Sequence, residues 1–257
     1  MGIIAIFTPK TAILFFLTKK PLLRELMPPD YTDIHSHLIP GIDDGSKTID
    51  ETVKLITGLR EIGFGRFITT PHIMPHVWDN TRQSIQQAEA STREALKAAG
   101  HGMPFKAASE YLMDGNFSEA LQREKLLVLK DNFILVEMSY INPPIQLMQI
   151  IFDIQLAGYV PVLAHPERYA FYHSNFGHYE KLRNSGCLFQ LNLLSTIGYY
   201  GANVADVAKK LLKRGMIDYT GSDVHHKNHV AGFHRRVVLK KTAPLEEAMR
   251  RNDFFRF

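Results

Sequence analysis

Short apolar runs alternate along this chain with longer segments in which apolar residues recur every three or four positions. The apolar runs predict strands at 31–37, 66–70, 105–110, 133–137, 159–164, 188–191 and 217–220. Helical spacing predicts helices at 49–62, 80–99, 118–124, 144–156, 203–213 and 245–250. This alternation is typical of a parallel sheet that helices cover on both faces.

Seven strand–helix units in 257 residues favour a closed or nearly closed α/β barrel of the TIM type. An open twisted sheet is the alternative. No linker interrupts residues 30–257, which we expect to form one domain.

Residues 1–29 differ in character and predict an N-terminal arm that ends at Pro28-Pro29. Two apolar runs, 3–7 and 12–17, are separated by Pro9-Lys10, and neither reaches the roughly 20 residues that span a bilayer. The order of charges and apolar residues does not fit a signal peptide. We expect the arm to serve peripheral membrane association or contact between subunits of an oligomer.

Composition narrows the function classes. The net charge is only +4, and no block of lysine and arginine predicts a nucleic-acid partner. A single cysteine, Cys187, excludes a disulfide framework and fits the reducing cytoplasm, where we place the protein. Leu193 stands where a cysteine-dependent phosphatase needs the arginine of Cys-x5-Arg, so we expect Cys187 to be structural.

Polar side chains gather where the predicted strands end. In an extended segment His35 and His37 project to the same side, just before Pro40-Gly41. Active sites of α/β barrels form at the carboxyl ends of the strands. Five imidazoles and four carboxylates are expected there: His35, His37, His72, His165, His225, Asp44, Glu110, Glu137 and Asp223.

Nine ligands are too many for one ion, so we predict a centre of two or three divalent metals. Nitrogen and oxygen donors without a thiolate favour Mn, Fe or Zn. Three divalent ions would exceed the charge of four carboxylates by two, which a phosphate dianion would balance. Arg168 could orient that phosphate, or form an ion pair with an acid, and Lys227 and His229 could add substrate contacts.

These residues resemble the PHP superfamily (polymerase and histidinol phosphatase), and specifically its bacterial CpsB/CapC/YwqE branch. The similarity begins with Asp33-Ile-His-Ser-His-Leu-Ile-Pro-Gly-Ile-Asp-Asp-Gly45. It continues in order through Thr70-Pro-His72, Ser109-Glu110, Glu137-Met-Ser139, Ala164-His-Pro-Glu-Arg-Tyr169 and Gly221-Ser-Asp-Val-His225.

The resemblance implies a distorted barrel of about seven strands and a metal-dependent protein-tyrosine phosphatase, often supported by Mn. Members oppose a tyrosine kinase that controls capsule or exopolysaccharide export, so the expected partner is a phosphotyrosine tail of such a kinase. By position, the resemblance implies one ion on His35, His37, Glu110 and Asp223, a second on Glu110, Glu137 and His165, and a third on Asp44, His72 and His225.

Arg168 matches the phosphate-contacting arginine of the family, whereas a second such arginine is not evident around Lys227 and His229. We expect hydrolysis of phosphotyrosine by a metal-activated water, without a phospho-cysteine intermediate. Two alternatives stay open: a phosphatase of small phosphomonoesters, such as histidinol phosphate, and a non-catalytic PHP module that binds a partner.

Overall fold

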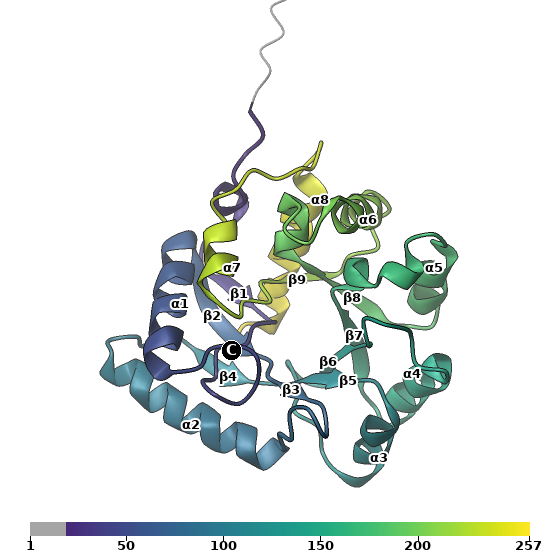
Figure 1. Ribbon diagram of the computed structural model, residues 1–257, viewed down its shortest axis with the longest axis horizontal. Coiled ribbons are helices and arrows are strands. Elements are labelled where there is room, and N and C mark those ends of the chain that lie inside the picture. The colour runs from purple at the N-terminus through teal and green to yellow at the C-terminus, as the bar shows by residue number, and fades with distance from the viewer. Residues whose placement is uncertain (1–18) are drawn as a thin grey trace, which may run out of the picture.

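Strands and helices alternate through residues 19–257, the part of the chain that the computed structural model describes (Figure 1). The strands are β1 (Tyr31–Asp33), β2 (Phe64–Thr69), β3 (His72–Ile73), β4 (Phe105–Ala107), β5 (Glu110–Leu112), β6 (Phe133–Glu137), β7 (Val160–Ala164), β8 (Leu188–Asn192) and β9 (Tyr219–Gly221). The α-helices are α1 (Ile49–Ile62), α2 (Arg82–Ala98), α3 (Gly115–Arg123), α4 (Leu147–Leu156), α5 (Gly177–Asn184), α6 (Ala202–Lys213), α7 (Lys227–Gly232) and α8 (Ala243–Arg251).

All the strand pairs within these sheets are parallel, which confirms the α/β class. One sheet has the order β1-β2-β4 and the other the order β3-β5-β6-β7-β8-β9. Between them, the Ala108 N–H donates to the Thr69 carbonyl (2.8 Å) and the Glu110 N–H donates to the Pro71 carbonyl (3.2 Å). β3 therefore continues β2, and β5 continues β4, so the described residues give seven strand positions around an incomplete barrel.

Backbone hydrogen bonds at one end and a side chain further down close the seam between the first and last strands, β1 and β9. At their carboxyl ends, the Asp223 N–H donates to the His35 carbonyl (2.7 Å) and the His37 N–H donates to the Val224 carbonyl (3.0 Å). Further down, the Asn252 Nδ2 lies 2.9 Å from the Thr32 carbonyl and 2.7 Å from the Thr220 carbonyl. The seam thus brings the two ends of the chain's βα series together at the candidate site.

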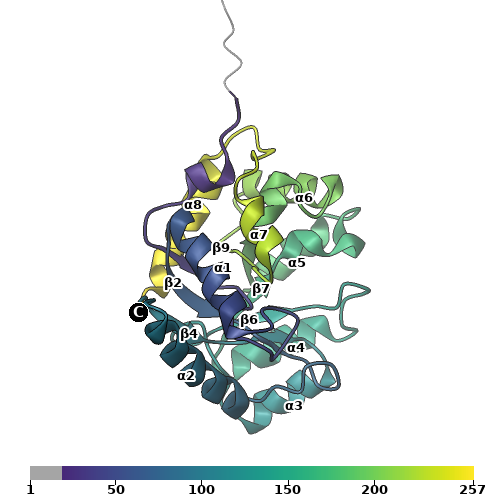
Figure 2. The same cartoon turned by 60° about the vertical axis from the view of Figure 1, so that its left-hand side comes forward.

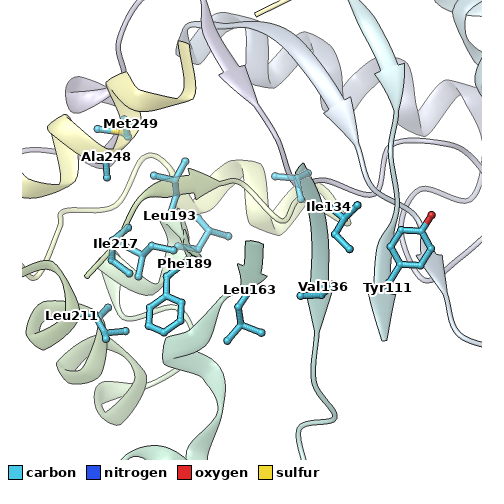
Figure 3. Close-up of a cluster of buried hydrophobic side chains, with 14 of the residues drawn as sticks. Tyr111, Ile134, Val136, Leu163, Phe189, Leu193, Leu211, Ile217, Ala248 and Met249 are labelled. Atoms are coloured by element: carbon cyan, nitrogen blue, oxygen red, sulfur yellow. The ribbon is translucent and has the colours of Figure 1, made fainter. Parts of the chain in front are cut away.

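The core has two layers because alternate strand residues point to opposite sides. Inside the strands lies a small cluster of buried apolar side chains: Ile34, Ile68, Ala108, Leu129, Leu135, Val162, Ala164 and Phe255. Outside, a larger cluster lies between strands and helices, and Figure 3 shows Val136, Leu163 and Phe189 of the strands with Leu211 of α6 and Met249 of α8. Burial on both sides explains why the strands read as continuous apolar runs.

The predicted elements agree with the structure except at several points. The predicted strand 31–37 forms β1 only over Tyr31–Asp33, followed by a single parallel bridge between Ser36 and Val224. The predicted strand 105–110 is split into β4 and β5, and β3 follows the predicted strand 66–70. The cause is Pro71, which lacks the N–H that would continue the ladder between the bond from Ala108 to Thr69 and the bond from Glu110 to Pro71. Helix α4 begins at Leu147 and not at Pro144, after a turn that the Leu147 N–H closes on the Pro144 carbonyl.

Helices α5 and α7 were not predicted. α7 has only six residues, too few for helical periodicity, and it packs beside α1 (Figures 1 and 2). α5 buries just Tyr179 and Leu182 within a mostly polar sequence.

Part of the predicted N-terminal arm, residues 1–18, lies outside the described residues. Residues 19–29 lie alongside the segment 233–238. The Leu23 N–H donates to the Arg235 carbonyl (2.9 Å), and the Leu23 side chain is fully buried. Within residues 19–257, every helix lacks the length and apolar character needed to cross a membrane.

Candidate metal centre

All nine predicted ligands lie toward the carboxyl ends of the strand positions, if β3 is taken with β2 and β5 with β4. The set follows β1 (His35, His37, Asp44), lies on β3 (His72) and β5 (Glu110), ends β6 (Glu137), and follows β7 (His165) and β9 (Asp223, His225). Six separate segments therefore deliver these side chains to one place, although β1 and β9 are far apart in sequence.

The nine residues form overlapping groups whose potential ligand atoms lie within 4.8 Å of one another. The groups are His35, His37 and Glu110; His72, Glu110 and Glu137; His37, Asp44, His72 and His225; and His35, His165 and Asp223. They overlap with the three expected ligand sets but divide the residues differently: His72 stands beside Glu110 and Glu137 where His165 was expected. His165 groups with His35 and Asp223, and His37 joins the group that contains Asp44.

Glu110 is the centre of the cluster. Its carboxylate is buried, and Oε2 lies 3.1 Å from His35 Nε2, 3.4 Å from His37 Nε2 and 3.4 Å from His72 Nδ1. Its other oxygen, Oε1, lies 3.1 Å from His165 Nε2. A single buried carboxylate that faces four imidazoles is suited to be shared between cations.

Neighbouring side chains fix how the imidazoles point. His35 Nδ1 lies 2.6 Å from Gln190 Oε1, and His37 Nδ1 lies 2.7 Å from Asp43 Oδ2. Both rings consequently direct Nε2 into the cluster. An acceptor on the far nitrogen of a ligating histidine fixes its tautomer and raises its basicity.

Two candidate ligands have unusual backbone conformations. His165 has φ of 35° and Asp223 has φ of 50°, in the left-handed region that side chains other than glycine seldom adopt. Such conformations cost free energy and persist where the surrounding structure imposes them, often at functional sites.

Charges in the cluster are strongly coupled. Although burial lowers the pKa of His35, the carboxylates of Glu110 and Asp223 raise it to about 9. Burial likewise opposes ionisation of Asp223, yet His35, His225 and Arg168 hold the pKa of this carboxyl well below its usual value. The buried carboxylates thus favour positive charge next to them, which either protons or metal ions can supply.

The donor set fits divalent metal ions. Buried His72 Nδ1 and Glu137 Oε1 lie 3.0 Å apart, yet neither makes a hydrogen bond within residues 19–257. Buried polar atoms without partners are costly, and a cation between them would satisfy both. Imidazole and carboxylate donors without thiolate suit Mn, Fe or Zn.

Arg168 lies beside this cluster, in a short 3-10 helix (Pro166–Arg168) after β7. It forms the predicted kind of ion pair with an acid, Asp223: its Nη1 donates to Asp223 Oδ2 at 2.7 Å. The pair leaves Asp223 Oδ1 facing His35, at 3.3 Å from Nε2.

The other two predicted substrate contacts lie in α7. Lys227 is exposed at the start of the helix. His229 is buried behind His225, and its Nδ1 accepts a hydrogen bond from the His225 N–H at 3.1 Å. Burial, with His226 nearby, lowers the pKa of His229 to about 4. Their contact with substrate stays a prediction.

Cys187 precedes β8, at the amino end of the strand and away from the cluster. It is buried, and burial raises the pKa of its thiol to about 12, so it carries no nucleophilic thiolate at neutral pH.

Sequence reasoning missed Asp43, Gln190, Asn192 and Tyr140, all of which contact the cluster or Arg168. Gln190 and Asn192 left one signal, since each is a polar residue within the apolar strand β8. Asp43 was hidden beside Asp44 in the same loop.

Comparison with known proteins identifies relatives of this chain. The family described as capsular polysaccharide synthesis, CpsB/CapC, matches residues 31–242. The tyrosine-protein phosphatase YwqE of Bacillus subtilis is 27% identical over 208 residues, which cover 80% of this chain and 82% of YwqE. The tyrosine-protein phosphatase CpsB of Streptococcus pneumoniae is 25% identical over 200 residues, or 76% of this chain and 82% of CpsB.

Solved structures agree with these relatives. One from a study of YwqE of Bacillus subtilis and CpsB of Streptococcus pneumoniae, described as unique metal-dependent tyrosine phosphatases, matches with a TM-score of 0.72 and 26% identity. The match covers 79% of this chain and 84% of that one. A phosphotriesterase homology protein from Escherichia coli matches with a TM-score of 0.51 at 13% identity, covering 89% of this chain and 99% of that one, and supports the fold alone.

Proposed function

Because this chain belongs to the CpsB/CapC family, we propose that it is a metal-dependent phosphatase that hydrolyses phosphotyrosine in proteins. The observation that carries the proposal is the buried Glu110 carboxylate, which faces His35, His37, His72 and His165 at 3.1 to 3.4 Å. Its relatives YwqE and CpsB are named tyrosine-protein phosphatases.

We propose that the nine clustered residues hold two or three divalent ions: His35, His37, Asp44, His72, Glu110, Glu137, His165, Asp223 and His225. Bound ions would supply positive charge for a phosphate and a water of lowered pKa for attack at phosphorus. We propose Mn as the native metal, with Fe or Zn as the alternatives that the same donors accept.

The chain's own residues position the reacting groups. Arg168 binds the phosphate, because a guanidinium offers a planar set of donors that matches phosphate oxygens. Asp223 fixes Arg168 through one oxygen while its other oxygen faces His35. Asp43 and Gln190 hold the imidazoles of His37 and His35 in place before substrate arrives.

The partner that we propose is a phosphotyrosine tail of a bacterial tyrosine kinase in capsule or exopolysaccharide synthesis. The family description and the relatives' names support this partner. We propose a cytoplasmic location, because a chain with a single cysteine forms no internal disulfide and fits a reducing compartment. Association of residues 1–29 with a membrane surface or a second subunit rests on their apolar runs alone.

The experiment compares substrates. Protein loaded with Mn²⁺ is assayed on phosphotyrosine peptides, phosphoserine peptides and histidinol phosphate. We expect the highest kcat/KM on phosphotyrosine peptides. Faster turnover of histidinol phosphate would assign a small-molecule phosphatase, and metal binding without turnover of any substrate would assign a non-catalytic module.

A further inference from the structure

Two tyrosine rings enclose the Arg168 guanidinium. Its Cζ lies 4.8 Å from the ring centroid of Tyr140 and 4.3 Å from that of Tyr200. Its Nη1 donates to Asp223, and within residues 19–257 the guanidinium makes no other hydrogen bond. The two rings therefore contact the guanidinium while its remaining N–H groups stay free for an anion.

Tyr200 is anchored within the protein. The Asn192 Nδ2 donates to the Tyr200 hydroxyl at 3.0 Å and to Asp223 Oδ2 at 2.9 Å. The same amide thus holds Tyr200 and the carboxylate that pairs with Arg168. Tyr200 belongs to the fixed wall of the site.

Tyr140 is different, because its ring reaches both the cluster and solvent. It follows β6 closely and stacks on His165, with ring centroids 5.6 Å apart and planes inclined by 24°. Its hydroxyl lies 3.3 Å from His165 Nε2. Even so, 47% of Tyr140 is exposed, and the next residue, Ile141, is 86% exposed. Tyr140 is therefore accessible to a ligand that reaches Arg168.

We propose that Tyr140 is a specificity-determining residue, which packs against the aromatic ring of an aryl phosphate and so selects it over an alkyl phosphate. This inference rests on the proposed phosphatase function. In an aryl phosphate only the ester oxygen separates phosphorus from the ring, so a phosphate on Arg168 brings that ring next to Tyr140. Paired aromatic rings attract beyond their burial of apolar area, whereas an alkyl ester offers no flat face.

The test measures binding as well as turnover, on Mn²⁺-loaded full-length protein. Calorimetry compares phenylphosphonate with methylphosphonate, two ligands that the enzyme does not hydrolyse. We expect Tyr140→Ala to weaken phenylphosphonate about three- to tenfold, and methylphosphonate by less than about twofold. The ratio of kcat/KM for para-nitrophenyl phosphate over O-phosphoserine should fall by a similar factor.

Two variants serve as controls. Tyr140→Phe keeps the ring and should keep the selectivity ratio. Ile145→Ala, at a fully exposed position before α4, should leave both affinities as they are. Elemental analysis of each variant verifies equal metal content.

Equal losses for both phosphonates in Tyr140→Ala would overturn the inference, because they would show that Tyr140 only supports Arg168 or the metals. Loss of selectivity in Tyr140→Phe, or unchanged ratios in Tyr140→Ala, would overturn it as well. If any of these results is obtained and the wild-type protein still hydrolyses phosphotyrosine peptides, the role of Tyr140 is refuted and the proposed function stands. If the wild-type protein hydrolyses no phosphoester and still binds phenylphosphonate through Tyr140, only the proposed function fails.

Discussion

Asp43 shows how a residue that does not face the cluster can control it. Its buried carboxylate lies 2.7 Å from His37 Nδ1, accepts the Gly45 N–H at 2.9 Å and accepts the His72 N–H at 3.3 Å. All three neighbours present hydrogen-bond donors to it. An amide at position 43 would turn its own N–H groups toward one of them.

We therefore expect Asp43→Asn to weaken metal binding about 10- to 100-fold, because His37 loses the acceptor that orients it. Titration with Mn²⁺, followed by calorimetry, measures the affinity. Asp206→Asn, on an exposed ion pair of α6, is the matched control and should bind metal like the wild type. An unchanged affinity in Asp43→Asn would show that the loop alone orients His37.

Among single residues, the sequence predicted the clustered ligands better than the residues that contact them. Glu137 was found because it ends a strand, and His35 and His37 were found because they follow one. Asp43 and Tyr140 lie on loops, whose path is set by tertiary contacts and not by a local period.

Among the elements, β9 has to pass very close to β1. A Cβ on Gly221, the last residue of β9, would lie 2.6 Å from the His35 Cβ and 2.8 Å from Gln190 Nε2. Real Cβ atoms do not approach so closely, so only glycine lets β9 run beside the ring of His35. The glycine thereby preserves the contact between His35 and Gln190.

We expect Gly221→Ala to lower the free energy of unfolding by about 1 to 3 kcal/mol, as overpacked sites do, and to weaken metal binding. Chemical denaturation and metal titration measure the two effects. Gly115→Ala in α3, where an added Cβ meets nothing within 4 Å, should be neutral in both. Wild-type stability and metal affinity in Gly221→Ala would refute the packing argument.

Elements were predictable where the apolar pattern was long. Helix α1 was predicted with its observed bounds from the helical spacing of its apolar residues. The structure shows that Thr48 caps its start and that Gly63 ends it in the left-handed conformation. The split of 105–110 into β4 and β5 was not predictable, since its cause is Pro71 on the neighbouring strand position.

The whole molecule depends on the seam between β1 and β9, where backbone bonds join the carboxyl ends and Asn252 bridges the strands further down. Its Nδ2 lies within 2.9 Å of the Tyr31 hydroxyl and of the Thr32 and Thr220 carbonyls, and its Oδ1 accepts the Thr220 N–H at 3.1 Å. One buried side chain near the C-terminus therefore joins the first strand to the last.

We expect Asn252→Ala to lower the free energy of unfolding by about 2 to 4 kcal/mol, because buried backbone groups of both strands lose partners. Urea denaturation measures the change. Asp253→Ala, at the exposed neighbouring position, should change stability by less than about 0.5 kcal/mol. Equal stability of the two variants would mean that Asn252 does not hold the seam.

The seven strand positions could be predicted from the alternation of strands and helices, but the seam could not. It depends on Asn252, Asp33 and Ser222, which are polar residues far apart in sequence. Asp33 accepts the Ser222 N–H at 2.9 Å. Both residues lie in motifs shared with the family, but the sequence predicted no contact between them.

The central claim is that clustered imidazoles and carboxylates hold metal ions that the phosphatase reaction requires. The most direct test measures metal content and turnover of a phosphotyrosine peptide in the same samples. We predict that exhaustive chelation, or His35→Ala with His37→Ala, removes metal and abolishes turnover, that Mn²⁺ restores the chelated wild type, and that Cys187→Ser stays active. Full turnover by wild-type protein shown by elemental analysis to be metal-free would contradict the account.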